Sequence, residues 1–284
     1  MRVGYLGPEG TFSHQALLDA KVAGEAQPVA LATLYDTVMA VQDAVVEAAL
    51  VPIENSLEGS VDVTLDTLAT DARDVEIVGE TVAEIRNCLI AAQPLELAAI
   101  ETVYSHPQAN AQCAQFLRTR LRDARVVPTS STADAVRSVT ADPGAANAAL
   151  GNRLAASLYG GRILLEDVDD HAGNQTRFVW LAPRAQREAV RARVGGSGPA
   201  KTSIVFWGAG DGTAGWLVSC LAELSERGVS LTRIESRPRR IGLGHYMFFA
   251  DFEGASDDPP VAAAIGGLRG RCQEVGLLGS YRRS

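Results

Sequence analysis

Short apolar segments alternate with stretches of helical spacing throughout the first 180 residues, and this alternation restricts the fold more than any other feature. Residues 2–6 and 48–53 have the composition of strands, and each is followed by apolar residues at helical spacing. Residues 99–104 lead into a helix near Pro107, where proline suits the first helical turn. Strands that alternate with helices in this way predict an α/β fold.

The composition changes after residue 182. Residues 183–200 combine several arginines with Gly195-Gly196-Ser197-Gly198-Pro199, a mixture of charge and helix breakers that is typical of a linker. The remaining residues, 201–284, are predicted to form strand, helix, strand, strand, helix and strand. This is the βαββαβ order of a ferredoxin-like domain.

The overall composition excludes several classes of protein. The formal net charge of −8 disfavours a nucleic-acid partner, and the apolar segments are too short and interrupted to cross a membrane. The N-terminus lacks the long apolar segment of a secretory signal. The cysteines lie far apart in the sequence without a C-x-x-C pair, which predicts reduced thiols in the cytoplasm and neither a disulfide nor a metal site: Cys88, Cys113, Cys220 and Cys272.

Two polar segments follow predicted strands. The first, G-P-E-G-T-F-S at 7–13, combines glycines with a helix start that offers N–H groups to an anion. Its spacing matches neither a dinucleotide fingerprint nor a P-loop, and taken alone the segment indicates an ordinary turn between a strand and a helix rather than a binding site. The second, V-P-I-E-N-S-L-E-G-S-V at 51–61, places Glu54 and Asn55 at a strand end, the usual ligand position in open α/β sheets. A capped turn explains the same residues equally well.

The segment S-H-P-Q-A-N-A-Q-C at 105–113 follows a third predicted strand. A helix that begins near Pro107 places Gln108 and Gln112 on one face. His106 precedes the proline, and we interpret it as a helix cap rather than a catalytic base.

The segment G-N-Q-T-R-F-V-W-L at 173–181 delivers Thr176 and Arg177 to the start of an apolar strand. The planar fork of arginine matches a carboxylate, which makes Arg177 the best anion ligand of the first domain. Neighbouring strand residues point to opposite faces, however. Thr176 and Arg177 therefore share a pocket only at a strand end or bend, and otherwise one of them is structural.

In this order and wording, the four segments resemble the prephenate dehydratase family. The resemblance continues with I-E-S-R-P at 234–238 and L-G-S-Y at 278–281, so it covers nearly the whole chain. The first segment begins at the N-terminus, which implies a monofunctional member without the chorismate mutase domain that precedes some relatives.

The resemblance implies a catalytic domain at residues 1–182, built as two periplasmic-binding-protein-like lobes around a cleft. Lobe one would comprise about 1–79 and 160–182, and lobe two about 80–159. A linker at 183–200 and a C-terminal regulatory domain of the ACT type at 201–284 would follow. The regulatory domain is expected to be separable, so that removing it leaves some catalysis.

The implied reaction converts prephenate to phenylpyruvate in L-phenylalanine biosynthesis, with loss of carbon dioxide and water and without a metal or organic cofactor. It belongs to the carbon–oxygen lyases. Thr176 would hydrogen-bond the leaving hydroxyl and Arg177 would hold a substrate carboxylate, with Glu54 and Asn55 as further catalytic residues. The implied substrate-binding residues are Ser105, Gln112, Asn174, Gly10 and Thr11.

The resemblance also implies that phenylalanine binds between paired C-terminal domains of a homo-oligomer, a dimer or a tetramer. One effector segment, Glu235-Ser236-Arg237-Pro238, matches the family motif. The other, Gly215-Trp216-Leu217-Val218, departs from it, because Trp216 replaces a small residue and narrows or reshapes the pocket. The potency and even the sign of regulation therefore stay open.

Two other functions remain as alternatives. Arogenate dehydratases share the fold and the chemistry on an aminated substrate, and nothing in this sequence separates the two. A non-catalytic amino-acid sensor would combine the same domains, but the intact N-Q-T-R-F segment at 174–178 disfavours it.

Overall fold

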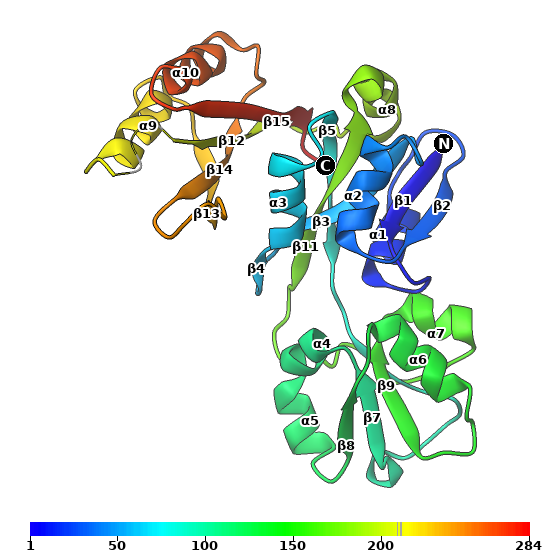
Figure 1. The fold of residues 1–284 in the computed structure, drawn as a ribbon. Coiled ribbons are helices and arrows are strands. Elements are labelled where there is room, and N and C mark those ends of the chain that lie inside the picture. Colours follow the sequence, from blue (N-terminus) through cyan, green and yellow to red (C-terminus); the bar gives the residue numbers. More distant parts are fainter. Residues whose placement is uncertain (209, 211) are drawn as a thin grey trace.

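The computed structural model describes residues 1–208, 210 and 212–284, and it arranges them as two lobes with a third unit at the C-terminal end (Figure 1). Lobe one has a sheet in which β1 pairs in parallel with β2 and β3, and β11 is antiparallel to both β3 and β5. Its elements are β1 (Arg2–Leu6), α1 (Phe12–Asp19), β2 (Gln27–Leu31), α2 (Leu34–Gln42), β3 (Ala48–Asn55), β4 (Gly59–Ser60), α3 (Asp62–Thr70), β5 (Val75–Glu84) and β11 (Gln175–Pro183).

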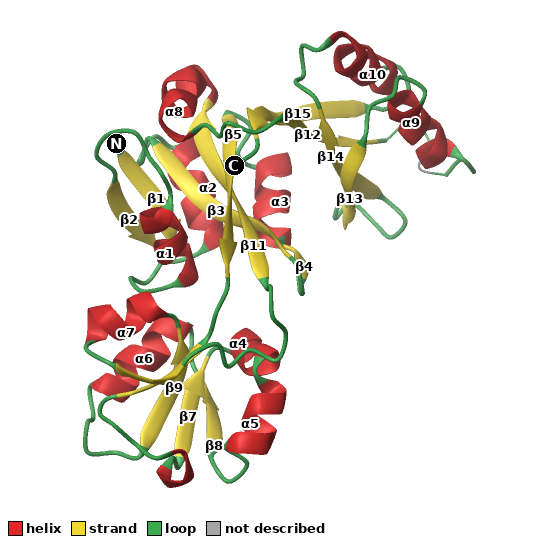
Figure 2. Cartoon of the chain, turned by 180° about the vertical axis from the view of Figure 1, so that it is seen from behind, coloured by secondary structure: helices red, strands yellow, loops and turns green. Residues whose placement is uncertain are grey.

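Lobe two is a separate five-stranded sheet of order β10-β6-β9-β7-β8. The chain enters it after β5 and leaves it before β11, so two connections join the lobes (Figures 1 and 2). The elements of lobe two are β6 (Cys88–Ala91), η1 (Leu97–Ala99), β7 (Thr102–Ser105), α4 (Pro107–Gln112), α5 (Ala114–Arg120), β8 (Arg125–Pro128), α6 (Thr132–Thr140), β9 (Asn147–Gly151), α7 (Arg153–Tyr159) and β10 (Arg162–Leu165).

The crossings differ slightly from the expected positions near residues 80 and 160. Strand β5 stays in the sheet of lobe one as far as Glu84, because β11 pairs with it along that length. Strand β10 stays in lobe two up to Leu165, where it pairs with β6. Side-chain caps fix the starts of the helices that border the cleft: Thr11 accepts from the N–H of His14, and Ser131 from that of Asp134.

The segment expected as a linker, 183–200, is largely ordered against lobe one. Pro183 ends β11, and η2 (Arg184–Gln186) and α8 (Arg187–Val194) follow. Val190 and Val194 of α8 are buried in the core that also holds Trp180. The breakers begin only where the helix ends, at Gly195, so the arginines before them belong to a packed helix.

The C-terminal unit has the βαββαβ order predicted from the sequence, and its strands run in the order β13-β14-β12-β15. The fold also brings together two cysteines that are distant in sequence: the Sγ atoms of Cys220 and Cys272 lie 3.7 Å apart, both as free thiols. The elements are β12 (Ala200–Trp207), α9 (Trp216–Ser225), β13 (Leu231–Pro238), β14 (Tyr246–Glu253), α10 (Pro259–Arg269) and β15 (Glu274–Arg282).

The C-terminal unit is continuous with lobe one. Strand β15 pairs in parallel with β5 at Gly279 and Ile77, which joins the two sheets. A Cβ atom at Gly279 would lie 2.2 Å from the carbonyl oxygen of Ile77, so this approach requires glycine. One buried apolar cluster also spans the boundary, with Leu65 and Ile77 on one side and Phe249 and Tyr281 on the other. Among the described residues, no helix is long and apolar enough to cross a membrane.

Candidate active site

A cavity of about 760 Å³ lies between the lobes. We call it the cleft. Lobe one contributes the turn before α1, the segment from Ala30 to Leu34, and the ends of β3 and β11. Lobe two contributes the starts of α4 and α6. Of the site residues predicted from the sequence, Thr11, Asn55, Gln112 and Thr176 all line the cleft, and so does His106.

Thr176 and Asn55 face each other on paired strands. Thr176 of β11 is in register with Asn55 of β3, and both side chains are largely buried. The Nδ2 group of Asn55 donates to the Thr176 hydroxyl at 2.9 Å and to Oδ1 of Asn174 at 2.8 Å. The amide of Asn55 thus connects the segment at 51–61 directly with the segment at 173–181.

The backbone fixes the orientation of the Asn55 amide. Its Oδ1 accepts the N–H groups of Leu57 at 2.9 Å and Glu58 at 3.0 Å, and a backbone N–H can only donate. The Asn55 NH₂ group must therefore face Thr176, whose oxygen accepts. Since that contact uses a lone pair, the hydroxyl proton of Thr176 remains available to an acceptor in the cleft.

Arg177 points to the opposite side of the sheet from Thr176. It does not line the cleft; its guanidinium pairs with Glu54 at 3.0 Å and with Asp251 of the C-terminal unit at 2.6 Å. Burial would lower the pKa of Arg177, but Asp251, Tyr281, Glu54 and Glu80 raise it above the ordinary arginine value. The structure thus places Arg177 and Glu54 away from the expected substrate position, because side chains alternate along β11 and β3.

The remaining sequence-predicted residues stand at different distances from the cleft. Asn174 lies behind it and accepts a hydrogen bond from Asn55, and its own Nδ2 is buried without a hydrogen-bond partner among the described residues. Ser105 is fully buried at the end of β7, and its hydroxyl also has no partner in the described structure. Gly10, at φ +84°, packs its backbone against Ala155 of lobe two, so it lies at the contact between the lobes.

Sequence reasoning missed some lining residues. Ser130, Ser131 and Thr132 at the start of α6 line the cleft opposite the turn before α1. The sequence of these three residues indicates only helix caps. A helix cap that follows a strand nevertheless places free N–H groups at the edge of the sheet, as the segment at 7–13 does. Phe178 also lines the cleft, two residues beyond Thr176 and therefore on the same face of β11.

His106 has the cap geometry predicted for it. Its Nδ1 accepts the N–H of Gln108 at 3.3 Å, and burial lowers its pKa. In the neutral ring the proton then sits on Nε2. His106 therefore offers the cleft a hydrogen-bond donor rather than a base.

Among the described residues, the two expected effector segments do not line one common cavity in the C-terminal unit. Residues 215–218 line a cavity of about 190 Å³ in the C-terminal unit. The indole of Trp216 packs against both Phe206 and Phe248, which stack on each other, and it donates to the carbonyl of Arg271. In the other segment, the side chains of Glu235 and Arg237 contact lobe one.

The effector motif on β13 is engaged by the β4 and α3 region of lobe one. Glu235 accepts from the hydroxyl of Ser60 at 2.6 Å, and Arg237 pairs with Asp66 at 2.9 Å and with Asp62. Neither Ser236 nor Pro238 lines the small cavity at residues 215–218.

The fold and the cleft define a two-lobed α/β protein that has a cavity between its lobes and carries a βαββαβ unit. A family profile described as prephenate dehydratase matches residues 3–186. The prephenate dehydratase of Mycolicibacterium vanbaalenii is 40% identical over 293 residues, covering 98% of this chain and 90% of the relative. The chain belongs to the prephenate dehydratase family, and its function is that of a prephenate dehydratase in phenylalanine biosynthesis.

Solved structures agree over the whole chain. Prephenate dehydratase from Arthrobacter aurescens in complex with L-Phe is 34% identical with a TM-score of 0.86, covering 100% of this chain and 90% of that one. A protein described as GqqA, a novel type of quorum quenching acylase, is 28% identical with a TM-score of 0.83, covering 100% and 98%. Because one fold carries differently described proteins, the cleft residues have to support the detailed chemistry.

Proposed function

We propose that the cleft catalyses a carbon–oxygen lyase reaction in which Thr176 assists the leaving hydroxyl of prephenate. The ring carboxylate departs as carbon dioxide, its bonding electrons aromatise the ring, and the hydroxyl takes up one proton that comes from solvent and leaves as water. The observation that carries this proposal is the hydrogen bond from Asn55 to the oxygen of Thr176, which leaves the threonine proton for the departing oxygen. A threonine hydroxyl is too weak an acid to ionise, so its role is hydrogen bonding in the transition state.

The substrate is a dianion, but no lysine or arginine lines the cleft among the described residues. The starts of α1 and α6 face it from the two lobes. First-turn N–H groups have no carbonyl partner within their helix, and the helix dipole favours an anion there. We assign the carboxylates of prephenate to these two helix starts, assisted by the side chains of Gln112 and His106.

The lining also favours prephenate over arogenate. Arogenate carries an ammonium group that needs a buried counter-charge. The only acidic side chain of the described lining is Asp134, and Ser130, Ser131 and Arg137 already bind its carboxylate. The test compares kcat/KM for the two substrates on the same folded protein, and a preference for arogenate would overturn this assignment.

We propose that phenylalanine regulates the enzyme at the C-terminal unit of a homo-oligomer in the cytoplasm. The Arthrobacter relative holds L-Phe. Several large apolar side chains are exposed on this unit and suit contact with a second copy: Val218, Ile234, Ile241, Leu243 and Tyr246. Free cysteines fit a reducing compartment.

Phenylalanine is expected to give a heat signal in calorimetry with the full-length chain at up to millimolar concentration. Trp216→Ala is expected to change its affinity, because the indole borders the small cavity and packs on Phe206 and Phe248. An unchanged affinity would move the site elsewhere. If neither phenylalanine nor tyrosine binds the wild type, the C-terminal unit serves assembly alone.

A further inference from the structure

Arg177 belongs to a buried ionic cluster that joins lobe one to the C-terminal unit. We call it the interdomain cluster: Arg177, Glu54 and Glu80 from lobe one, and Lys201, Arg233, Asp251 and Tyr281 from the C-terminal unit. Arg177 donates to Asp251 at 2.6 Å and to the Tyr281 hydroxyl at 3.3 Å. Lys201 reaches back across the boundary to Glu80 at 2.7 Å.

The cluster is balanced in charge, and apart from the partly exposed Glu54 its charged side chains are shielded from water. It contains three cations and three carboxylates, and the side chains of Asp251 and Glu80 are each only 4% exposed. Arg177 is 10% exposed and Lys201 is 10% exposed. Because these side chains are shielded from water, removing one partner of an ion pair costs much stability. The position of the Arg177 guanidinium therefore depends on the C-terminal unit.

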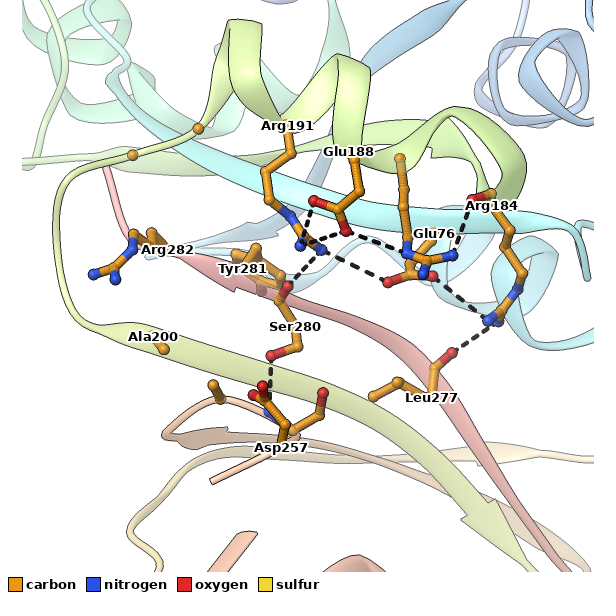
Figure 3. A pocket seen from close by; sticks show the side chains of 15 residues that line it. Glu76, Arg184, Glu188, Arg191, Ala200, Asp257, Leu277, Ser280, Tyr281 and Arg282 are labelled. Carbon is orange, nitrogen blue, oxygen red and sulfur yellow. Dashed lines mark hydrogen bonds and ion pairs between the residues drawn. The ribbon is translucent and has the colours of Figure 1, made fainter. Parts of the chain in front are cut away.

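Strand β15 is also held to lobe one on another side, around a cavity next to α8 (Figure 3). Arg184 donates to the carbonyl of Leu277 at 2.9 Å, and Arg191 donates to that of Ser280 at 3.0 Å. Glu76 of β5 lies between the two arginines, 3.6 Å from Arg184 and 3.9 Å from Arg191. These contacts hold β15 in place. Because Tyr281 of this strand accepts a hydrogen bond from Arg177, they also restrict the position of the Arg177 guanidinium.

We propose that Arg177 is a positioning residue through which the C-terminal unit sets the place of Thr176 in the cleft. The two residues are adjacent in β11, so a guanidinium anchored by Asp251 and Tyr281 fixes the backbone that presents the Thr176 hydroxyl to Asn55. A displacement of about 1 Å at a reacting group can cost about 10²-fold in rate. The inference rests on the proposed role of Thr176.

The test measures steady-state kinetics of the full-length Arg177→Lys, Asp251→Asn and double variants with prephenate. We expect each single variant to lower kcat about 10-fold or more with KM nearly unchanged. The double variant should lose little more than either single one, because both break the same contact. Glu253→Gln on the same strand as Asp251 is the matched control: it breaks an exposed pair with Arg283 and should leave kcat unchanged.

Two results would overturn the proposal. A raised KM for Arg177→Lys, together with normal kinetics of Asp251→Asn, would make Arg177 a substrate ligand. A lowered melting temperature with unchanged kcat per folded enzyme would make the cluster merely structural. If Asp251→Asn does not fold, Tyr281→Phe removes one hydroxyl from the cluster and must show the kcat effect. Absence of phenylpyruvate from the wild type would instead contradict the proposed function.

Discussion

Thr176→Ala is expected to lower kcat for prephenate about 10²-fold or more while the protein stays folded. The substitution removes one hydroxyl that accepts from Asn55 and faces the cleft. It leaves the strand pairing of β11 with β3 and β5 in place. Phenylpyruvate absorbance gives the rate, and thermal melting confirms the fold.

Two further variants define the chemical origin of that loss. Thr176→Ser keeps the hydroxyl and should retain most of the activity. Asn55→Asp keeps the acceptor for the N–H groups of Leu57 and Glu58, but its second oxygen would accept the proton of Thr176 and withdraw it from the substrate. Asn55→Asp should therefore lower kcat despite its similar size. Normal turnover in folded Thr176→Ala would remove this residue from the mechanism.

Deletion of residues 201–284 is expected to abolish folding and activity, contrary to the expectation of a separable domain. The cut would expose Ile77 and Leu65, which share a buried cluster with the C-terminal unit. It would also leave Arg177 and Glu80 without Asp251 and Lys201. Removing one partner of a buried pair costs about 3–5 kcal/mol, against a typical total stability of about 5–15 kcal/mol.

Expression and melting of the truncated chain check this expectation. We predict aggregation, or a chain without a cooperative melting transition. A matched control chain that ends at residue 282 lacks only the last two residues and should behave like the wild type. A soluble truncated protein that melts cooperatively and turns over prephenate would show that lobe one does not depend on the interdomain cluster.

Local sequence rules predict much of the fold, since apolar spacing and caps act within a few residues. The strand before the first motif, the helix at Pro107 and the βαββαβ order all have such local causes. The prediction of a linker is wrong for α8, because its arginines have the pattern of solvated charge. Arg184, just before this helix, and Arg191 within it instead donate to carbonyls of β15 that are about ninety residues away.

The candidate site is predictable in part. Strand alternation alone indicates that Thr176 and Arg177 lie on opposite faces, and the structure places only Thr176 at the cleft. Alternation does not say which of these two side chains faces the cleft. That depends on the C-terminal unit, since Asp251 and Tyr281 contact Arg177. Long-range pairs of this kind leave no periodic trace in a sequence. The same holds for the neighbouring thiols of Cys220 and Cys272.

The most direct measurement is the product formed when the purified full-length chain meets prephenate, with arogenate assayed beside it. We predict that phenylpyruvate absorbance rises with turnover, that carbon dioxide is released in equal amount, and that arogenate reacts more slowly. A folded protein that forms no phenylpyruvate from prephenate would contradict the assignment of this cleft as the catalytic site of a prephenate dehydratase.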